Sequence, residues 1–221
     1  MILTGTDQLW VADTTSIRLR EEFVFLAVIL DAYSRCVIGW ALDRTLANRL
    51  TISALEQAIA QRRPRPGLVH HSDRGLQYAR GEYVAVLEKF GMVPSMSRPA
   101  NPYDNASCES FIKTLKREEI YANKYDNLER LQANIEEFIE QYYNRQRLHS
   151  ALGYRSPEEF ERENSQENSA QSPGATVEFV VHNENSENQE RGSKKLAGDE
   201  DSTAVLFPSP LLLLPDATKD Q

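Results

Sequence analysis

Three acidic residues have the chemistry of a metal-binding site. Asp13 lies inside an apolar, strand-like run, Asp73 follows a second such run, and Glu109 opens a helix-like segment. Carboxylate oxygens are the ligands that hard divalent cations prefer. Two such ions can activate a water or hydroxyl and stabilise the leaving oxygen of a phosphoryl transfer. The three residues together therefore predict a metal-dependent phosphoryl-transfer site.

Taken singly, each of these residues has an ordinary structural explanation. An aspartate at a strand end usually caps a turn, and this is the role expected for Asp31 and Asp43. Glu109 alone would favour the dipole of a helix start. Asp13 differs, because an unpaired carboxylate inside an apolar strand pattern is costly. The combination, rather than any one residue, favours a site.

The segment around Glu109 predicts a helix with two distinct faces. On a 3.6-residue helical wheel, Lys113 falls about 40° and Lys116 about −20° from Glu109. The apolar residues Phe111, Ile112 and Leu115 occupy a separate arc between about 200° and 300°. One face can pack on a sheet while the other presents a carboxylate and two ammonium groups together.

A cysteine nucleophile is the alternative chemistry, with Cys108 close in sequence to Glu109 and with His70 and His71 just before Asp73. Cys108 and Glu109 point about 100° apart on a helix, and no third group is placed to orient a base. The two cysteines form no CxxC pair, so there is no zinc-ligand spacing and no disulfide framework. This composition indicates a reducing, intracellular setting. His149 is expected to pack or to form hydrogen bonds.

The hydrophobic pattern predicts an α/β fold. Five strands are expected at Leu9–Ile17, Phe23–Leu30, Cys36–Leu42, Leu68–His70 and Met92–Met96. The continuous apolar run Phe23–Leu30 is typical of a strand buried on both faces, and it is far too short to span a bilayer.

Further helices are expected around Ile52–Ile59, ending at Arg62-Arg63, and around Tyr83–Leu87, closed by Gly91. A last helix is expected to begin with a capping box of Asp126 and Glu129, and its expected buried stripe is Leu128, Leu131, Ile135, Phe138 and Tyr142.

Charge divides the chain into two regions. The formal net charge is −8, of which residues 1–163 carry −2 and residues 164–221 carry −6. Ser, Asn, Gln and Glu dominate from Asn164, and the apolar periodicity stops there. We therefore expect a core over 1–163 and an acidic, disordered tail over 164–221.

Seven motifs follow one another between Gln8 and Phe160. They are Leu-Trp-Val-Ala-Asp13-Thr, Leu-Asp31-Ala-Tyr-Ser-Arg-Cys-Val-Ile-Gly-Trp40, His-His-Ser-Asp73-Arg-Gly-Leu-Gln-Tyr78, Ser-Met-Ser-Arg98-Pro, Asn101-Pro-Tyr-Asp-Asn-Ala, Glu109-Ser-Phe-Ile-Lys-Thr-Leu-Lys-Arg-Glu118 and Tyr143-Asn-Arg-Gln-Arg-Leu-His149-Ser-Ala-Leu-Gly-Tyr154-Arg-Ser-Pro157. In this order they resemble the catalytic core of bacterial insertion-sequence transposases of the OrfB type, within the retroviral integrase superfamily. Thirty-five residues separate Asp73 from Glu109, which is the spacing of the DDE signature of that family.

The resemblance implies a ribonuclease H-like fold, with a mixed five-stranded sheet flanked by helices. It implies that Asp13, Asp73 and Glu109 bind two Mg²⁺ or Mn²⁺ ions, and that water or a DNA 3′-hydroxyl attacks a phosphodiester. Lys113, Lys116 and the adjacent Arg117 are the candidate DNA-binding residues. The segment from Arg98 to Asn105 resembles the mobile loop beside the active site of the family.

The resemblance also implies partners and a location. The expected partners are the DNA ends of the element and a target DNA, with a homo-oligomer as the active form and no membrane. The expected location is the bacterial cytoplasm. Because Asp13 comes soon after Met1, the chain is expected to lack the helix-turn-helix segments that precede the core in relatives. Two alternatives stay open: a truncated, inactive remnant that binds DNA weakly, and a nuclease of the ribonuclease H type.

Overall fold

The structure is a computed structural model that describes residues 2–73, 75–79, 81–96, 105–170 and 177–178. These residues belong to one compact unit, Met1–His182, and a second unit, Asn183–Gln221, lies outside the described ranges. The predicted tail beyond 170, apart from 177–178, is therefore outside the description. The predicted mobile loop is outside it as well, except for Asn105.

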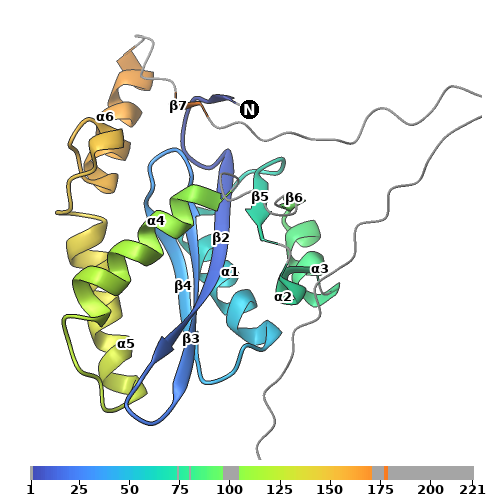
Figure 1. Ribbon diagram of the computed structural model, residues 1–221. Coiled ribbons are helices and arrows are strands. Elements are labelled where there is room, and N and C mark those ends of the chain that lie inside the picture. Colours follow the sequence, from blue (N-terminus) through green and yellow to red (C-terminus); the bar gives the residue numbers. More distant parts are fainter. Residues whose placement is uncertain (1, 74, 80, 97–104, 171–176, 179–221) are drawn as a thin grey trace, which may run out of the picture. The chain divides into compact units, whose positions relative to one another are not determined.

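A mixed five-stranded sheet forms the centre of the described unit (Figure 1). The strand order is β4-β3-β2-β5-β6. The first three strands along the chain form an antiparallel meander, and the last two run parallel to β2. The strands are β2 (Leu9–Arg18), β3 (Phe23–Asp31), β4 (Val37–Asp43), β5 (Val69–Ser72) and β6 (Val93–Met96). All five predicted strands are confirmed, with small differences at their ends.

β3 is buried on both faces, as its continuous apolar run predicts. Val24, Leu26 and Val28 belong to one apolar cluster, whereas the alternate residues Ala27 and Ile29 belong to another. Period-two alternation assigns successive side chains to opposite faces of a sheet. The sheet therefore separates two hydrophobic cores, each of which must be covered by helices.

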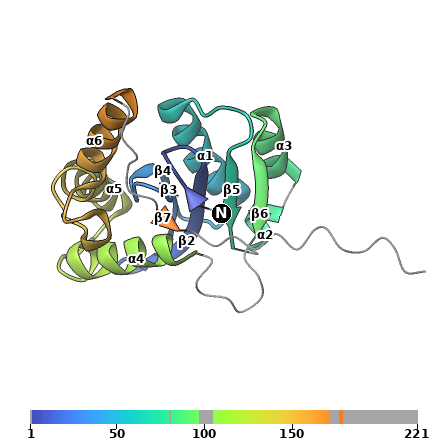
Figure 2. The same cartoon turned by 90° about the horizontal axis from the view of Figure 1, so that it is seen from above.

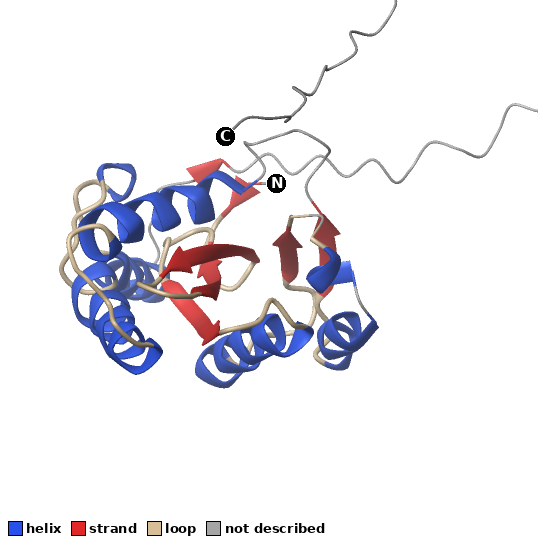
Figure 3. Ribbon diagram, turned by 60° about the horizontal axis from the view of Figure 1, so that its bottom comes forward, coloured by secondary structure: helices blue, strands red, loops and turns tan. Residues whose placement is uncertain are grey.

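Helices cover both faces of the sheet (Figures 2 and 3). α1 (Asn48–Arg62) and α3 (Gly81–Lys89) supply buried side chains to the cluster that contains Ala27. α4 (Ala106–Leu115) and α5 (Leu128–Glu137) supply side chains to the other cluster. A short α2 (Leu76–Ala79), which the sequence pattern did not predict, precedes α3. No helix within the described ranges has the length and apolar character needed to cross a membrane.

Two glycines are required by local geometry. Gly39 of β4 lies so close to α1 that a Cβ atom there would stand 2.3 Å from the carbonyl oxygen of Ala54. Gly91 adopts φ +66° just after α3, and the Met92 N–H donates to the Leu87 carbonyl at 2.9 Å. The predicted closure of this helix by Gly91 is therefore confirmed.

The capping box predicted at the start of α5 is wrong by one residue. Asn127, not Asp126, is the N-cap, and its side chain accepts a hydrogen bond from the Arg130 N–H at 2.8 Å. Asn127 has the extended backbone conformation that an N-cap residue requires.

The buried stripe of α5 also differs at its end. The helix continues as the π-helical turn η3 (Phe138–Tyr143), in which Tyr143 is buried and Tyr142 is 39% exposed. A π-turn bonds each N–H one residue further back than an α-turn. This widening places the side chain five residues after Phe138, rather than four, toward the core.

The predicted boundary at Asn164 falls inside a helix, α6 (Pro157–Ala170). The amide nitrogen of Asn164 donates to the Phe160 carbonyl at 2.7 Å, and its amide oxygen accepts a hydrogen bond from the Tyr33 hydroxyl at 3.2 Å. The Phe160 ring packs against Tyr33 with centroids 5.3 Å apart. These contacts stabilise a helix across Asn164, in a polar segment whose composition alone suggested disorder. A short antiparallel pair, β1 (Ile2–Leu3) with β7 (Val177–Glu178), lies apart from the main sheet.

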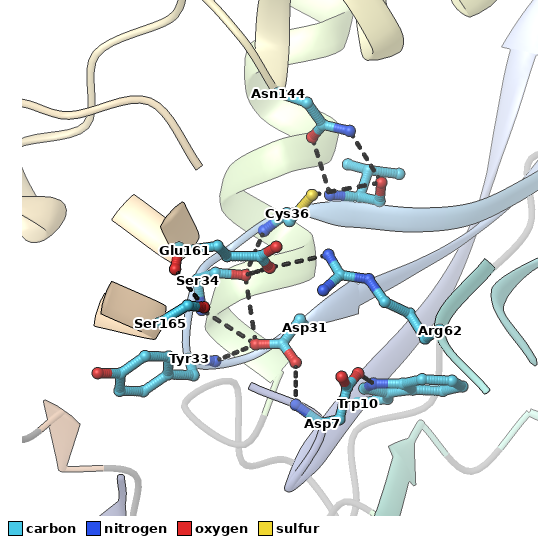
Figure 4. A network of polar contacts seen from close by, with 11 residues as sticks. Asp7, Trp10, Asp31, Tyr33, Ser34, Cys36, Arg62, Asn144, Glu161 and Ser165 are labelled. Carbon is cyan, nitrogen blue, oxygen red and sulfur yellow. Dashed lines mark hydrogen bonds and ion pairs between the residues drawn. The ribbon is translucent and has the colours of Figure 1, made fainter. Parts of the chain in front are cut away.

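A buried polar network joins the β3–β4 turn to α1 and α6 (Figure 4). Asp31 accepts hydrogen bonds from the backbone N–H groups of Asp7, Tyr33 and Ser34 at 2.7–3.0 Å. The Arg62 guanidinium forms an ion pair with Glu161 at 2.8 Å. The turn-capping role predicted for Asp31 is confirmed. Asp43 also caps a turn, because its carboxylate accepts the Thr45 N–H at 2.9 Å.

Candidate active site

The parallel pairing of β2 with β5 places Asp13 and Asp73 side by side. Ala12 of β2 is in register with Ser72, the last residue of β5, and Asp13 and Asp73 are the next residues along the chain. Neighbouring strands lie about 4.8 Å apart. The sheet register therefore brings together two carboxylates that are far apart in sequence.

Helix α4 brings the third carboxylate to the same place. The Cys108 thiol donates to the Val11 carbonyl at 3.3 Å, and the Asn105 amide nitrogen donates to the Ala12 carbonyl at 3.2 Å. These contacts fix the start of α4 on β2 just before Asp13. Glu109 is the next residue after Cys108 and is half-buried.

The three carboxylates share one electrostatic environment. Burial, together with the negative charges of Asp73 and Glu109, raises the pKa of Asp13 to about 6. A hydrogen bond from the Thr14 N–H, at 2.7 Å, and the positive charge of Lys116 act in the opposite direction. The Asp13 carboxylate therefore faces the repulsion of two negative neighbours, so this place favours binding a cation.

The side chains themselves do not converge on one point. Among the described residues, no group of three or more His, Cys, Asp or Glu side chains is placed to hold a metal ion. Asp73 accepts the Gly75 N–H at 2.9 Å, and the Glu109 carboxylate lies 3.5 Å from the Lys113 ammonium group. That Asp13, Asp73 and Glu109 bind metal ions therefore stays a prediction. Mutual repulsion favours local partners, while the oxygen-only donor set still fits Mg²⁺ or Mn²⁺.

The predicted basic residues differ in their surroundings. Lys113 of α4 contacts Glu109, and its side chain is 78% exposed, whereas Lys116, the residue directly after α4, is half-buried. Arg117 forms an ion pair with Glu118 at 2.6 Å. A groove of about 500 Å³ is lined by Ala106, Glu109, Ser110, Lys113, Thr114, Arg117 and Arg147.

Comparison with known proteins identifies the domain. Two sequence profiles, both described as integrase core domain, match residues 4–102 and 91–157. Together they span the sheet, the three carboxylates and α5. Residues 4–157 belong to the integrase core family.

Curated relatives of this integrase core are bacterial insertion-sequence proteins. The chain is 41% identical over 162 residues to the transposase of IS904 from Lactococcus lactis, covering 73% of this chain and 64% of the relative. It is 38% identical over 161 residues to the transposase InsF of IS3A from Escherichia coli, covering 73% and 56%. The chain thus spans about three fifths of the length of these relatives.

A solved structure shows the same fold. The catalytic core domain of the integrase of HTLV-2, solved in complex with magnesium as a dimeric form, superposes with a TM-score of 0.53. The match has 16% sequence identity and covers 71% of this chain and 97% of that chain. The predicted ribonuclease H-like fold is therefore confirmed.

Three polar residues of the integrase core were missed by the sequence reasoning. Asn105 is buried, and its amide oxygen has no hydrogen-bond partner within the described part of the chain. Gln77 donates to the Thr14 hydroxyl at 3.2 Å, beside Asp13, and Arg147 pairs with Glu118 at 3.2 Å. All three stand inside the motifs quoted above, so each could have been nominated as a residue that supports a neighbouring carboxylate or base.

The cysteine alternative has no geometric support in this integrase core. Cys108 is fully buried, and burial raises the pKa of its thiol well above the ordinary value. Only the thiolate is an effective nucleophile. Nε2 of His70 is 3.0 Å from the Tyr83 hydroxyl, and burial lowers the pKa of His70 to about 4. His149 packs edge-on against Tyr143 with ring centroids 4.9 Å apart, which confirms its predicted packing role.

Proposed function

We propose that this integrase core is the catalytic part of a DNA transposase, a metal-dependent polynucleotidyl transferase of the DDE type. The observation that carries the proposal is the register of β2 and β5, with Asp13 and Asp73 side by side and Glu109 brought to them by α4. The family membership and the spacing of the three acids support the same reaction. Its proposed setting is the bacterial cytoplasm.

Asp13, Asp73 and Glu109 are the proposed ligands of two Mg²⁺ or Mn²⁺ ions. Bound ions of this kind supply an activated water or 3′-hydroxyl and neutralise charge on the leaving oxygen. Asp13 loses its proton more readily once positive charge is present, because the negative neighbours that raise its pKa are then compensated. Glu109 must exchange its contact with Lys113 for the metal site. That exchange costs little, because the ion pair is long and its lysine is 78% exposed.

DNA is the proposed partner, as element ends and as target, with a homo-oligomer as the active form. Lys113, Lys116 and Arg117 follow Glu109 along α4 and its π-helical continuation η2 (Lys116–Ile120). Contacts between cationic side chains and phosphates position a DNA strand without reading its sequence. These residues would hold the reacting phosphate beside the carboxylates.

A strand-transfer assay tests the proposal. Duplexes taken from the DNA that flanks the gene, with recessed 3′-hydroxyl ends, are incubated with a plasmid target and Mg²⁺ or Mn²⁺. The wild-type chain should join the ends to the plasmid, and Asp13→Asn, Asp73→Asn or Glu109→Gln should lower joining by about a hundredfold or more. Glu56→Gln, an exposed carboxylate of α1, is the matched control and should act as wild type.

The same assay separates the alternatives. Cleavage of an RNA–DNA hybrid without joining would indicate a nuclease of the ribonuclease H type. The absence of both reactions in the wild-type chain would indicate an inactive remnant. Equal joining by the wild type and all three carboxylate variants would refute the site assignment.

A further inference from the structure

A second groove, of about 770 Å³, opens beside the candidate active site, and we name it the hairpin groove. One wall comes from the end of β2 and the turn into β3, and the other comes from η2 and the segment that leads to α5. Its lining residues are Ser16, Ile17, Arg18, Leu19, Arg20, Phe23, Lys116, Ile120, Tyr121, Asn123, Lys124, Tyr125 and Asp126. Of these lining residues, only Lys116 has a role in the function proposed above.

The hairpin groove is strongly basic although the whole chain is acidic. Four cations line it, Arg18, Arg20, Lys116 and Lys124, against the single carboxylate of Asp126. Within the described part of the chain, none of these four cations forms an ion pair with an acidic side chain. Most other basic groups near α4 are paired, as Arg117 and Arg147 are with Glu118. Unpaired cations gathered in a hollow favour an anionic ligand.

Aromatic rings stand at the same groove. The Tyr121 side chain is 75% exposed and Phe23 is 51% exposed. The guanidinium carbon of Arg18 lies 5.2 Å from the centroid of the Phe23 ring, so that ring already has a planar cation over it. The Tyr121 ring is the more exposed of the two and is the one available for a base to stack on. Exposed aromatics interleaved with cations are the composition of surfaces that bind unpaired nucleic acid, where bases stack and phosphates pair.

The position of the groove relates it to the carboxylates. Lys116 lines the groove and also acts electrostatically on Asp13. Ser16 to Arg18 follow Asp13 along β2 by three to five residues. A strand rises about 3.3 Å per residue, which gives roughly 10 to 17 Å. For a strand that keeps the duplex spacing of about 3.4 Å per nucleotide up to the groove, this distance corresponds to roughly three to five nucleotides.

We propose that the hairpin groove binds an unpaired DNA strand about three to five nucleotides from the reacting phosphate, with its phosphates on Arg18, Arg20 and Lys124 and a base stacked on Tyr121. This inference rests on the proposed DNA transferase function. The volume of the groove suits a few nucleotides and is within the range of small-ligand sites. A duplex needs a broad basic surface. The exposed ring of Tyr121, in contrast, can stack only on a base that is not already stacked in a duplex, so the groove favours an unpaired strand.

Fluorescence anisotropy with the full chain tests the groove directly. The probe is a labelled duplex of about 20 base pairs, either blunt or with a single-stranded extension of about six nucleotides, measured in EDTA so that no cleavage occurs. The wild type should bind the extended probe more tightly than the blunt one. Tyr121→Ala should weaken binding of the extended probe by about fivefold or more, whereas Tyr121→Phe should retain it because the ring remains.

The cations are tested through the salt dependence of binding. Arg18→Ala/Arg20→Ala should lower the slope of log Kd against log salt concentration by about 1.4 for the extended probe, because each phosphate contact on a single strand contributes about 0.7. Arg65→Ala/Arg130→Ala removes the same charge from exposed positions elsewhere and should leave the slope unchanged. All substituted residues are exposed, and thermal melting verifies that each variant folds.

Three results decide the matter. If the extension gives the wild type no gain, or if the gain survives in both Tyr121→Ala and the double arginine variant, the groove does not bind the strand. If the groove fails this test while the wild type still joins DNA ends, the groove assignment is refuted and the proposed function stands. If the wild type neither binds nor joins DNA, both fall.

Discussion

The molecule contains two clusters of acidic residues that differ in how their charges are satisfied. In the buried network, Asp31 receives three backbone N–H groups, and Glu161 pairs with Arg62 (Figure 4). In the candidate active site, Asp13 receives one N–H group and faces two further carboxylates. The positive charge of Lys116 partly compensates these negative charges. Burial raises the pKa of both Asp13 and Asp31 to about 6.

The comparison teaches that a raised pKa alone does not identify a functional carboxylate. Asp31 has donors for its charge and holds a turn and its neighbours in place. Asp13 has only one such donor, the Thr14 N–H group, and its acidic neighbours repel it. A bound cation therefore stabilises an acidic cluster that lacks other hydrogen-bond donors and cations.

The largest expected effect is on stability, in the satisfied cluster. Arg62→Ala leaves Glu161 largely buried without its partner, so the free energy of unfolding should fall by about 3 to 5 kcal/mol. Lys113→Ala, at the exposed pair with Glu109, should change it by less than about 0.5 kcal/mol. Urea unfolding of both variants measures the difference. Arg62→Ala/Glu161→Ala should recover part of the loss, and equal effects at the two pairs would contradict the distinction.

The pH dependence of stability should show both clusters at once. The folded pKa values of about 6 for Asp13 and Asp31 lie above the ordinary value of 3.8, so the folded state binds these protons more tightly than the unfolded state. Their contribution is fully present below about pH 4 and is lost as the pH rises through about 6, by up to about 3 kcal/mol for each group. Urea unfolding between pH 4 and 7 measures this.

The variant Asp13→Asn separates the contributions of Asp13 and Asp31 to the pH dependence of stability. Asp13→Asn should remove its own part of the pH dependence and leave the part that belongs to Asp31. A pH profile identical to that of the wild type would mean that Asp13 does not titrate in this range.

Magnesium should stabilise only the unsatisfied cluster, and this is the smallest expected effect. At a Mg²⁺ concentration ten times its Kd, the gain is about 1.4 kcal/mol, or roughly 3 to 6 °C in Tm. Asp13→Asn, Asp73→Asn and Glu109→Gln should each lose the gain, whereas the Glu56→Gln control should retain it. Thermal melting with Mg²⁺ and with EDTA measures the shift. A gain that persists in all three carboxylate variants would place the ion elsewhere.

Local patterns in the sequence were sufficient for the five strand segments and for the separation of faces on α4. A strand or a helix face depends on residues two to four positions apart, so alternation and helical spacing report it directly. The order of the motifs was sufficient to nominate Asp13, Asp73 and Glu109. The one-residue errors at Asn127 and Tyr143 arose where a cap and a π-turn changed the local register.

The sequence by itself determined which residues could do chemistry: three carboxylates in family spacing, and the cations that follow Glu109. Only the tertiary structure decided how those residues meet. The register of β2 with β5 and the packing of Cys108 on Val11 are long-range contacts, which no local pattern encodes. The helix that continues past Asn164 depends likewise on neighbours in space, through the contacts of Phe160 and Asn164 with Tyr33. Charge and hydrogen-bond satisfaction, which distinguish Asp13 from Asp31, exist only after the chain has folded.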